Sequence, residues 1–327
     1  MHFHLTEEQT AIQDAVRGTL ADCWPMERIH AFADGDADFD PQSWTALMAL
    51  GLGAILTPDS GMGLLDAALA CEVAGEAAAA GPLIGQLLAA AAAAASGQGD
   101  ADALACGEKV ATLIHGGSSY APSARAADLF LIVDRDSGVR LVPAADAAIE
   151  AVRAADRTRP MSVVAIPEGA GDTLFAAADP MTARLADAAL VLVAADALGG
   201  AQKVTDMSVA YAKEREQFGQ PIGRFQGLKH QLAHMALDVE PARALLWYAA
   251  YAWDAELPDA PHAAAIAKAH LCEVYVRATR AAIAAHGGIG YTWEYGLHYW
   301  FRRAMADRAW LGSPAEHRAR AAKFAGW

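Results

Sequence analysis

The feature that most constrains the fold is a long apolar seam in the second half of the chain. Its residues recur at alternating steps of four and three positions: Leu228, Leu232, Met235, Val239, Ala242, Leu246, Ala249 and Trp253. An average step of 3.5 residues keeps these side chains on one helical face, as in nearly antiparallel packed helices. The sequence therefore predicts a helix of about seven turns inside a helical bundle.

Three more helices are expected around this one, at about 182–213, at about 263–285 and after Thr292. Thr292 is a suitable N-cap, and Glu294 would lie in the first turn of the fourth helix, on which Trp293, Trp300 and Trp310 are placed. Residues 179–327 are therefore predicted to form a four-helix bundle.

The rest of the chain divides into two predicted domains. Residues 1–108 are mainly helical, beginning after Thr6 with apolar positions at Ile12, Val16 and Leu20. Residues 109–178 hold short β-favouring runs, VATLI, DLFLIV, VRLVP and SVVAI, separated by Gly, Pro, Asp and Ser. The predicted fold class is mainly α, with a small central β domain between an N-terminal helical domain and the bundle.

The charge balance and the cysteine spacing exclude several classes of function. Acidic residues outnumber basic ones 39 to 25, and a net charge of -14 without a basic stripe disfavours a nucleic-acid partner. The four cysteines lack a CxxC pair or a Cys/His cluster, so free buried thiols are expected rather than disulfides or a metal site: Cys23, Cys71, Cys106 and Cys272.

Neither end of the sequence nor its most apolar stretch predicts export or a membrane span. The N-terminus lacks a basic segment followed by an apolar core. The stretch 84–100 is mostly alanine and shorter than about twenty apolar residues, which indicates a buried or surface helix. A cytoplasmic protein is expected.

Two interruptions of the predicted bundle carry residues suited to binding phosphates. In EREQFGQPIGRFQ, Arg215 lies where a helix should end, so it could interact with the helix dipole or clamp a pyrophosphate with two parallel hydrogen bonds. In HGGIGYT, Gly287 and Gly288 could cap a helix or let phosphates approach the backbone. Either segment alone leaves both interpretations open.

Together, the two segments resemble the acyl-CoA dehydrogenase family. The run R-x-x-F-G-x-P-I-x-x-F-Q, followed some sixty residues later by H-G-G-I-G-Y-T, is highly specific, and the order of segments is similar along essentially the whole chain. The resemblance implies transfer of an α-proton of an acyl-CoA thioester to a carboxylate and of a β-hydride to FAD. It also implies an electron-transfer flavoprotein as the acceptor.

The same resemblance assigns cofactor contacts to five residues. Arg215, Phe218 and Gln226 match positions that reach across a subunit interface to the FAD of a neighbour. Gly287 and Gly288 match the turn against the pyrophosphate and adenosine portion of that FAD.

The chain departs from the family at both positions that can carry the catalytic base. The turn that usually holds a glutamate reads AWLGSP here, which places Leu311 at that position, and the alternative position is Ala189. The nearest carboxylates are Asp187, about 200° round the helix, and Asp196, on the same face but roughly 10 Å along it. Asp196 could serve only a displaced substrate, and a pairing role is the favoured interpretation.

Two further departures concern the cofactor. The β region lacks both the T-E-P-x-x-G-S-D-like loop and the following tryptophan that cradle the flavin ring in relatives. Ala284 stands where many relatives have a glutamine that contacts the adenosine half. His286, although part of the HGG turn, is expected to be structural, as it is in relatives.

These losses resemble the shorter, base-lacking subunit of bacterial α2β2 acyl-CoA dehydrogenases, whose partner supplies the base and the ring site. Such pairs act on bulky acyl-CoAs, including steroid-type thioesters. Two alternatives remain open from the sequence: a self-sufficient homo-oligomeric dehydrogenase that uses Asp196, and a structural or regulatory subunit without cofactor contact, suggested by Ala284.

Overall fold

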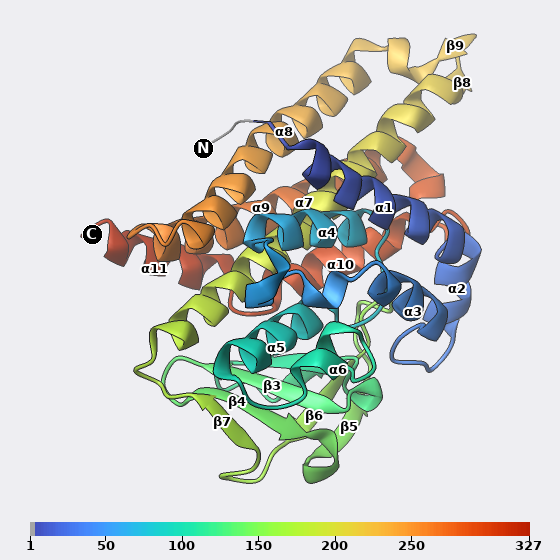
Figure 1. The fold of residues 1–327 in the computed structure, drawn as a ribbon. Coiled ribbons are helices and arrows are strands. Elements are labelled where there is room, and N and C mark those ends of the chain that lie inside the picture. Colours follow the sequence, from blue (N-terminus) through green and yellow to red (C-terminus); the bar gives the residue numbers. More distant parts are fainter. Residues whose placement is uncertain (1–3) are drawn as a thin grey trace.

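Helices form both ends of the chain and a small β region lies between them in the computed structural model, which describes residues 4–327 (Figure 1). The fold class predicted from the sequence is confirmed. Residues 1–3 of the predicted N-terminal domain lie outside the described range.

The N-terminal helices begin as the sequence predicts. Thr6 Oγ1 accepts a hydrogen bond from the Gln9 backbone N–H, and the Gln9 side chain accepts one from the Thr6 N–H, which satisfies two free donors at the helix start. Val16 and Leu20 are buried, as expected. The helices are α1 (Glu7–Cys23), α2 (Met26–Asp34), α3 (Pro41–Ala49), α4 (Leu64–Glu76), α5 (Leu83–Ser96) and α6 (Ala101–Ala105), with 3-10 turns at Leu52–Ala54 and Pro58–Ser60.

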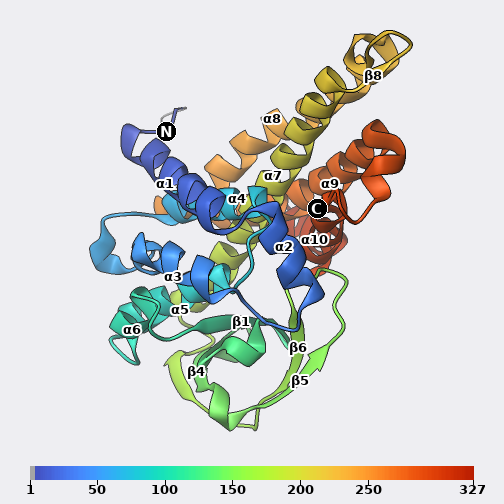
Figure 2. The ribbon, with the colours of Figure 1, turned by 90° about the vertical axis from the view of Figure 1, so that its right-hand side faces the viewer.

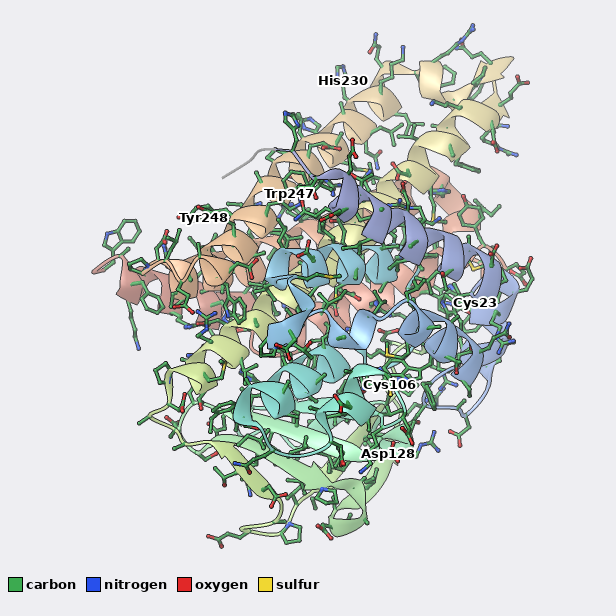
Figure 3. All side chains as sticks on the ribbon, viewed as in Figure 1. Cys23, Cys106, Asp128, His230, Trp247 and Tyr248 are labelled. Carbon is green, nitrogen blue, oxygen red and sulfur yellow. The ribbon has the colours of Figure 1, made fainter. Side chains whose placement is uncertain are left out.

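The alanine-rich stretch forms α5, which is buried over most of its length. Within residues 4–327, no helix combines the length and the apolar character that a membrane span requires. The prediction of free thiols is wrong in one detail, because Cys106 at the end of α6 is exposed whereas Cys23 is buried (Figure 3).

The β region consists of two small sheets. One has the strand order β1-β3-β4-β7, in which β1 and β3 are parallel, and the other is the antiparallel sheet β2-β6-β5. The four predicted runs correspond to β1, β3, β4 and β6, whereas three short or alanine-rich strands were not predicted. The strands are β1 (Ala111–His115), β2 (Tyr120–Pro122), β3 (Leu129–Asp134), β4 (Gly138–Pro143), β5 (Ala148–Val152), β6 (Met161–Ala165) and β7 (Asp172–Phe175).

Strand β3 joins two cores. Leu131 and Val133 face the main core that includes α5, whereas Phe130 and Ile132 face a smaller core shared with β2 and β6. Successive side chains of a strand point to opposite faces, so one apolar run can fill both cores.

The C-terminal bundle is built from α7 (Pro180–Glu214), α8 (Gln226–Asp254), α9 (Ala260–His286), α10 (Leu297–Ala309) and α11 (Pro314–Phe324). The middle of the predicted seam is buried: Met235, Val239, Ala242, Leu246 and Ala249. The end of α7 and the start of α8 extend as a hairpin beyond the rest of the molecule (Figures 1 and 2).

The prediction of a single fourth helix after Thr292 is wrong. Thr292 follows a 3-10 turn (Gly287–Tyr291), and α10 begins only after Gly296, whose φ of 76° is left-handed. Trp300 lies in α10, but Trp293 precedes this helix and Trp310 follows it. The left-handed Gly296 delays the start of α10, and Leu311 and Gly312, with φ values of 62° and 100°, interrupt the helix before α11.

Helices α4 and α7 cross at two glycines. A Cβ on Gly199 would lie 1.7 Å from the Glu72 carbonyl oxygen, and a Cβ on Gly75 would lie 2.1 Å from the Asp196 carbonyl oxygen. Only glycine permits this approach. The crossing buries the middle of α7, which is where Asp196 lies.

Candidate functional site

The motif around Arg215 forms the tip of the α7–α8 hairpin. Two short strands, β8 (Glu216–Gln217) and β9 (Gln220–Pro221), flank Phe218 and Gly219, whose φ values are 54° and 77°. Two central residues with positive φ are typical of a tight two-residue hairpin turn. Phe218 is 92% exposed and meets the Phe225 ring edge-on at 6.0 Å. An apolar ring held out in solvent by a strained turn is unusual for a purely structural residue.

The backbone of Arg215 is held by hydrogen bonds, whereas its side chain makes no ion pair within residues 4–327. Its N–H donates to the Tyr211 carbonyl at 2.8 Å, and its own carbonyl accepts from the Ile222 N–H at 2.8 Å. The side chain is exposed and makes no ion pair within residues 4–327. Gln226 is also exposed and starts α8. The structure therefore brings Arg215, Phe218 and Gln226 to one tip.

His286 connects the HGG turn to the same end of the bundle. Its ring stacks on Tyr211 at 4.5 Å, one helical turn before Arg215. Nδ1 lies 2.7 Å from the Ala282 carbonyl oxygen and Nε2 lies 2.9 Å from the Tyr295 hydroxyl, so Nδ1 carries the proton that it donates to the carbonyl. Burial lowers the pKa of His286. The geometry agrees with a structural residue, as expected from the sequence.

The two glycines after His286 differ in whether the structure explains the absence of a side chain. Gly287 has φ 64° and ψ -138°, a conformation that other residues rarely adopt. Gly288 has no positive φ, and a Cβ built there would meet no atom of this chain within 4 Å. Neither backbone conformation nor packing within the described chain explains glycine at position 288. Both glycines and Ala284 are exposed.

Neither family base position offers a proton acceptor. Ala189 is fully buried in α7. Leu311 is nearly buried between α10 and α11, at a φ of 62°, and its carbonyl accepts a hydrogen bond from His317 Nε2 at 2.8 Å. His230 and His234, which could also serve as bases, are exposed on α8, and Figure 3 shows His230 on the hairpin at the start of this helix.

Leu311 lines a cavity of about 710 Å³ between the β region and α10 and α11. Its walls are mostly apolar. Asp156 Oδ1 accepts two hydrogen bonds from Thr158, whereas Asp156 Oδ2 is buried and has no hydrogen-bond partner within residues 4–327. The Glu316 carboxylate caps α11 at Ser313. Burial lowers the pKa of His115 to about 4, so its ring is neutral near pH 7.

Asp187, one of the two carboxylates nearest the base position, is held by two arginines. Arg135 Nη2 and Arg320 Nη2 each lie 2.6 Å from Asp187 Oδ1. Arg135 follows β3, Asp187 lies on α7 and Arg320 lies on α11. The carboxylate therefore ties the β region to the bundle.

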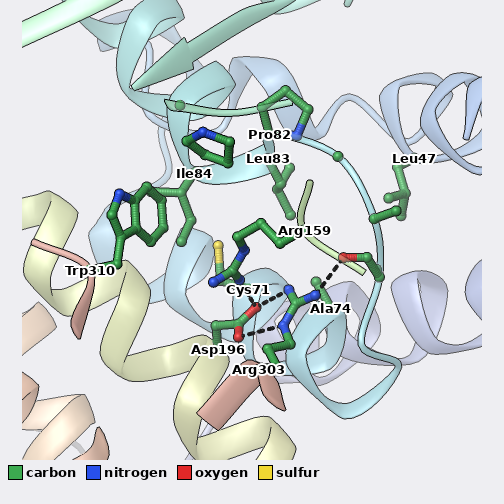
Figure 4. Close-up of a pocket in the computed structure, with 15 residues that line it drawn as sticks. Leu47, Cys71, Ala74, Pro82, Leu83, Ile84, Arg159, Asp196, Arg303 and Trp310 are labelled. Carbon is green, nitrogen blue, oxygen red and sulfur yellow. Dashed lines mark hydrogen bonds and ion pairs between the residues drawn. The ribbon is translucent and has the colours of Figure 1, made fainter. Parts of the chain in front are cut away.

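Asp196, the other carboxylate, lies between two buried arginines (Figure 4). Arg303 donates Nη2–H to Oδ1 at 2.5 Å and Nε–H to Oδ2 at 2.9 Å, and Arg159 Nη2 lies 3.0 Å from Oδ1. Burial opposes ionisation of Asp196, but Arg303 and Arg159 more than offset it and lower its pKa. The space left beside this network is about 20 Å³, enough for one water molecule.

Asp307 on α10 completes the buried network. It pairs with Arg159, while its Oδ2 has no hydrogen-bond partner. Burial, together with the nearby charge of Asp196, raises the pKa of Asp307 to about 8 against the pull of Arg159 and Arg303. The network therefore favours the ionised form of Asp196 and the protonated form of Asp307.

The sequence singled out Asp187 and Asp196 but missed Arg159, Arg303 and Asp307. Their ion-pair partners lie between 37 and 148 positions away along the chain. A charged residue within an apolar helical stripe, such as Asp196, indicates a buried ion pair, but the sequence pattern does not identify which residue is the partner.

Three comparisons with known proteins place the chain among relatives. The C-terminal domain model of acyl-CoA dehydrogenases matches residues 182–326. Acyl-CoA dehydrogenase IpdE2 of Mycolicibacterium smegmatis is 31% identical over 318 residues, which cover 95% of this chain and 97% of that protein.

Solved structures agree over almost the full length. The structure titled Tcur3481-Tcur3483 steroid ACAD G363A variant superposes with a TM-score of 0.86 at 25% identity, covering 98% of both chains. The ChsE4-ChsE5 complex from Mycobacterium tuberculosis gives 0.88 at 23% identity, covering 99% and 98%, and supports the fold alone. With a full-length relative at 31% identity and a matching C-terminal domain, the chain belongs to the acyl-CoA dehydrogenase family.

Proposed function

We propose that this chain is one subunit of an FAD-dependent acyl-CoA dehydrogenase that desaturates an acyl-CoA thioester with a dissimilar, dehydrogenase-like partner in an α2β2 assembly. The partner supplies the catalytic carboxylate and the seat of the flavin ring. This chain supplies Arg215, Phe218, Gln226, Gly287 and Gly288 to the cofactor across the interface. The chain alone is inactive.

The observation that carries this proposal is the loss of a proton acceptor at both base positions, together with the state of the two carboxylates nearest Ala189. Leu311 and Ala189 cannot accept a proton, and Asp187 and Asp196 each pair with two arginines. A general base needs a carboxylate that is free to approach the α-carbon. The lowered pKa of Asp196 makes it a weaker base still. The self-sufficient alternative that uses Asp196 is therefore disfavoured.

The residues at the tip suit the phosphate half of FAD. Arg215 presents an unpaired guanidinium, whose planar donors match phosphate oxygens. No atom of the described chain lies within 4 Å of the position that a Cβ on Gly288 would take, so a ligand can approach the backbone there. When bound, FAD accepts the hydride from the β-carbon. In this proposal Arg215 and the turn at Gly287 and Gly288 would orient FAD through its phosphate half, away from the atoms that react.

The relatives support the proposed substrate class, and the family resemblance supports the proposed electron acceptor. The similar structure named Tcur3481-Tcur3483 is described as a steroid acyl-CoA dehydrogenase. A bulky, steroid-type acyl-CoA is accordingly the proposed substrate, and an electron-transfer flavoprotein is the proposed acceptor.

Flavin content per chain tests the division of labour. The chain is expressed alone and together with candidate dehydrogenase-like partners from the same genome, and the flavin absorbance near 450 nm is measured per chain. We expect a colourless lone chain and one flavin for every two chains in the mixture. A yellow lone chain that oxidises an acyl-CoA unaided would contradict the proposal.

Replacing Gly288 with alanine distinguishes an effect on cofactor binding from an effect on folding stability. A Cβ at this position meets no atom of the described chain within 4 Å, so the free energy of unfolding in urea should change by less than about 0.5 kcal/mol. If flavin phosphates approach this backbone, flavin retention by the assembled complex should fall about tenfold. The control is Gly18→Ala, where a Cβ also meets no atom within 4 Å but which lies in α1. Equal flavin content in the two variants would favour the subunit without cofactor contact.

A further inference from the structure

Three arginines converge on a surface pocket that is separate from the hairpin tip and borders the Leu311 cavity at Ala154. The pocket, of about 310 Å³, is lined by Arg153 and Arg157 from the loop between β5 and β6, by Arg302 from α10, and by Asp34 at the end of α2. Figure 2 shows α2 and α10 close together on the side where this loop rises from β5. Segments far apart in the sequence thus build one basic site.

The three guanidinium groups have no carboxylate partner. Within residues 4–327, most arginines of this acidic chain make an ion pair, but Arg153, Arg157 and Arg302 make none. Asp34 is the acidic group of the pocket, and Asp36 nearby is paired with Arg125. Three positive charges therefore face one negative charge.

Backbone contacts hold two of these arginines in place. Arg157 donates Nε–H to the Ala33 carbonyl at 2.9 Å and Nη2–H to the Gly35 carbonyl at 3.3 Å. Arg302 donates Nη1–H to the Ala155 carbonyl at 3.4 Å, and its guanidinium lies over the Trp293 ring at 6.0 Å. Each keeps at least one N–H-bearing nitrogen without a partner, so the cations are positioned but not neutralised.

Like charges fixed side by side repel one another, and a multiply charged anion relieves that repulsion. Guanidinium groups bind phosphate oxygens with paired, charge-assisted hydrogen bonds. We infer that this pocket binds the phosphate groups of a small organic phosphate. Diphosphates fit the three-cation arrangement better than monoanions, because they carry at least two negative charges on a compact group. This inference does not depend on the function proposed above.

Calorimetric titration tests the site with inorganic pyrophosphate, ADP and coenzyme A added to the purified chain, compared with acetate. We expect pyrophosphate and ADP to bind and acetate not to bind, with affinity falling as salt rises. Tighter binding of ADP or coenzyme A than of pyrophosphate would show that the organic part also contributes. Absence of binding by all three phosphates at millimolar concentration would overturn the inference.

The variant that tests the residues is Arg153→Gln/Arg302→Gln, which leaves Arg157 and its contacts to α2 intact. The double substitution should weaken pyrophosphate binding at least tenfold without changing the unfolding midpoint. Arg318→Gln, an exposed and unpaired arginine on α11, is the matched control and should bind like the wild type. Unchanged pyrophosphate binding in the double variant would refute the assignment.

Discussion

Substitution of Arg215 by alanine should weaken flavin binding by the assembled complex roughly 30- to 1000-fold. Removing one side of a desolvated, charge-assisted contact costs about 2–4 kcal/mol, and each 1.4 kcal/mol is tenfold in affinity. Arg215 has no partner of its own within the described chain, so its loss should leave folding unaffected. The measurement is the flavin released on dilution of the co-purified complex, together with the unfolding midpoint.

Two controls narrow the interpretation of the Arg215 experiment. Arg224→Ala removes another exposed arginine without an ion pair near the same tip and should retain flavin. Arg215→Lys keeps the charge but loses the paired donors, so it should retain flavin only in part. Unaltered flavin content in Arg215→Ala would mean that the tip does not touch the cofactor, and would leave the structural-subunit interpretation standing.

Replacement of Arg303 by methionine should lower the free energy of unfolding by about 3–5 kcal/mol. Arg303 is 2% exposed, and its guanidinium binds both oxygens of Asp196, the Ala79 carbonyl and the Thr158 hydroxyl. Methionine fills much of the space but removes all three of these hydrogen-bonding contacts, and it leaves the buried Asp196 carboxylate with Arg159 as its one remaining arginine partner. The midpoint and slope of urea unfolding give the change.

Arg308→Met on the same helix is the matched control. Arg308 pairs with Glu273 at 2.8 Å, but its side chain is 42% exposed, so the expected loss is below about 1 kcal/mol. Similar losses for the two variants would show that the buried network contributes no more than a surface pair.

The same network should make stability depend on pH through Asp307. Its pKa in the folded chain, about 8, lies above the ordinary carboxyl value, so the folded state holds a proton that the unfolded state has lost between those two values. Stability should therefore fall as pH rises from about 5 to 8 and level off above the folded pKa. Asp307→Asn should flatten this part of the profile. An unchanged slope in that variant would assign the pH dependence to other groups.

The local pattern of the chain determined its helices and its family. The 3.5-residue seam required a long helix with apolar neighbours, and Thr6 with Gln9 set where α1 begins, because spacing and capping are properties of adjacent residues. The Arg215 and HGG segments marked the two interruptions for the same reason. What local pattern could not give was the late start of α10, which follows the left-handed Gly296 packed against Met26.

Only the tertiary structure decided what the buried charges do. The sequence showed that Leu311 and Ala189 lack a proton acceptor, but Asp196 stayed a candidate until Arg159 and Arg303 were found beside it. These partners come from a β-region loop and from α10, and no spacing rule connects them to α7. A carboxylate's chemistry is set by the charges and the water within a few ångströms of it, and those neighbours are chosen by folding rather than by adjacency along the chain.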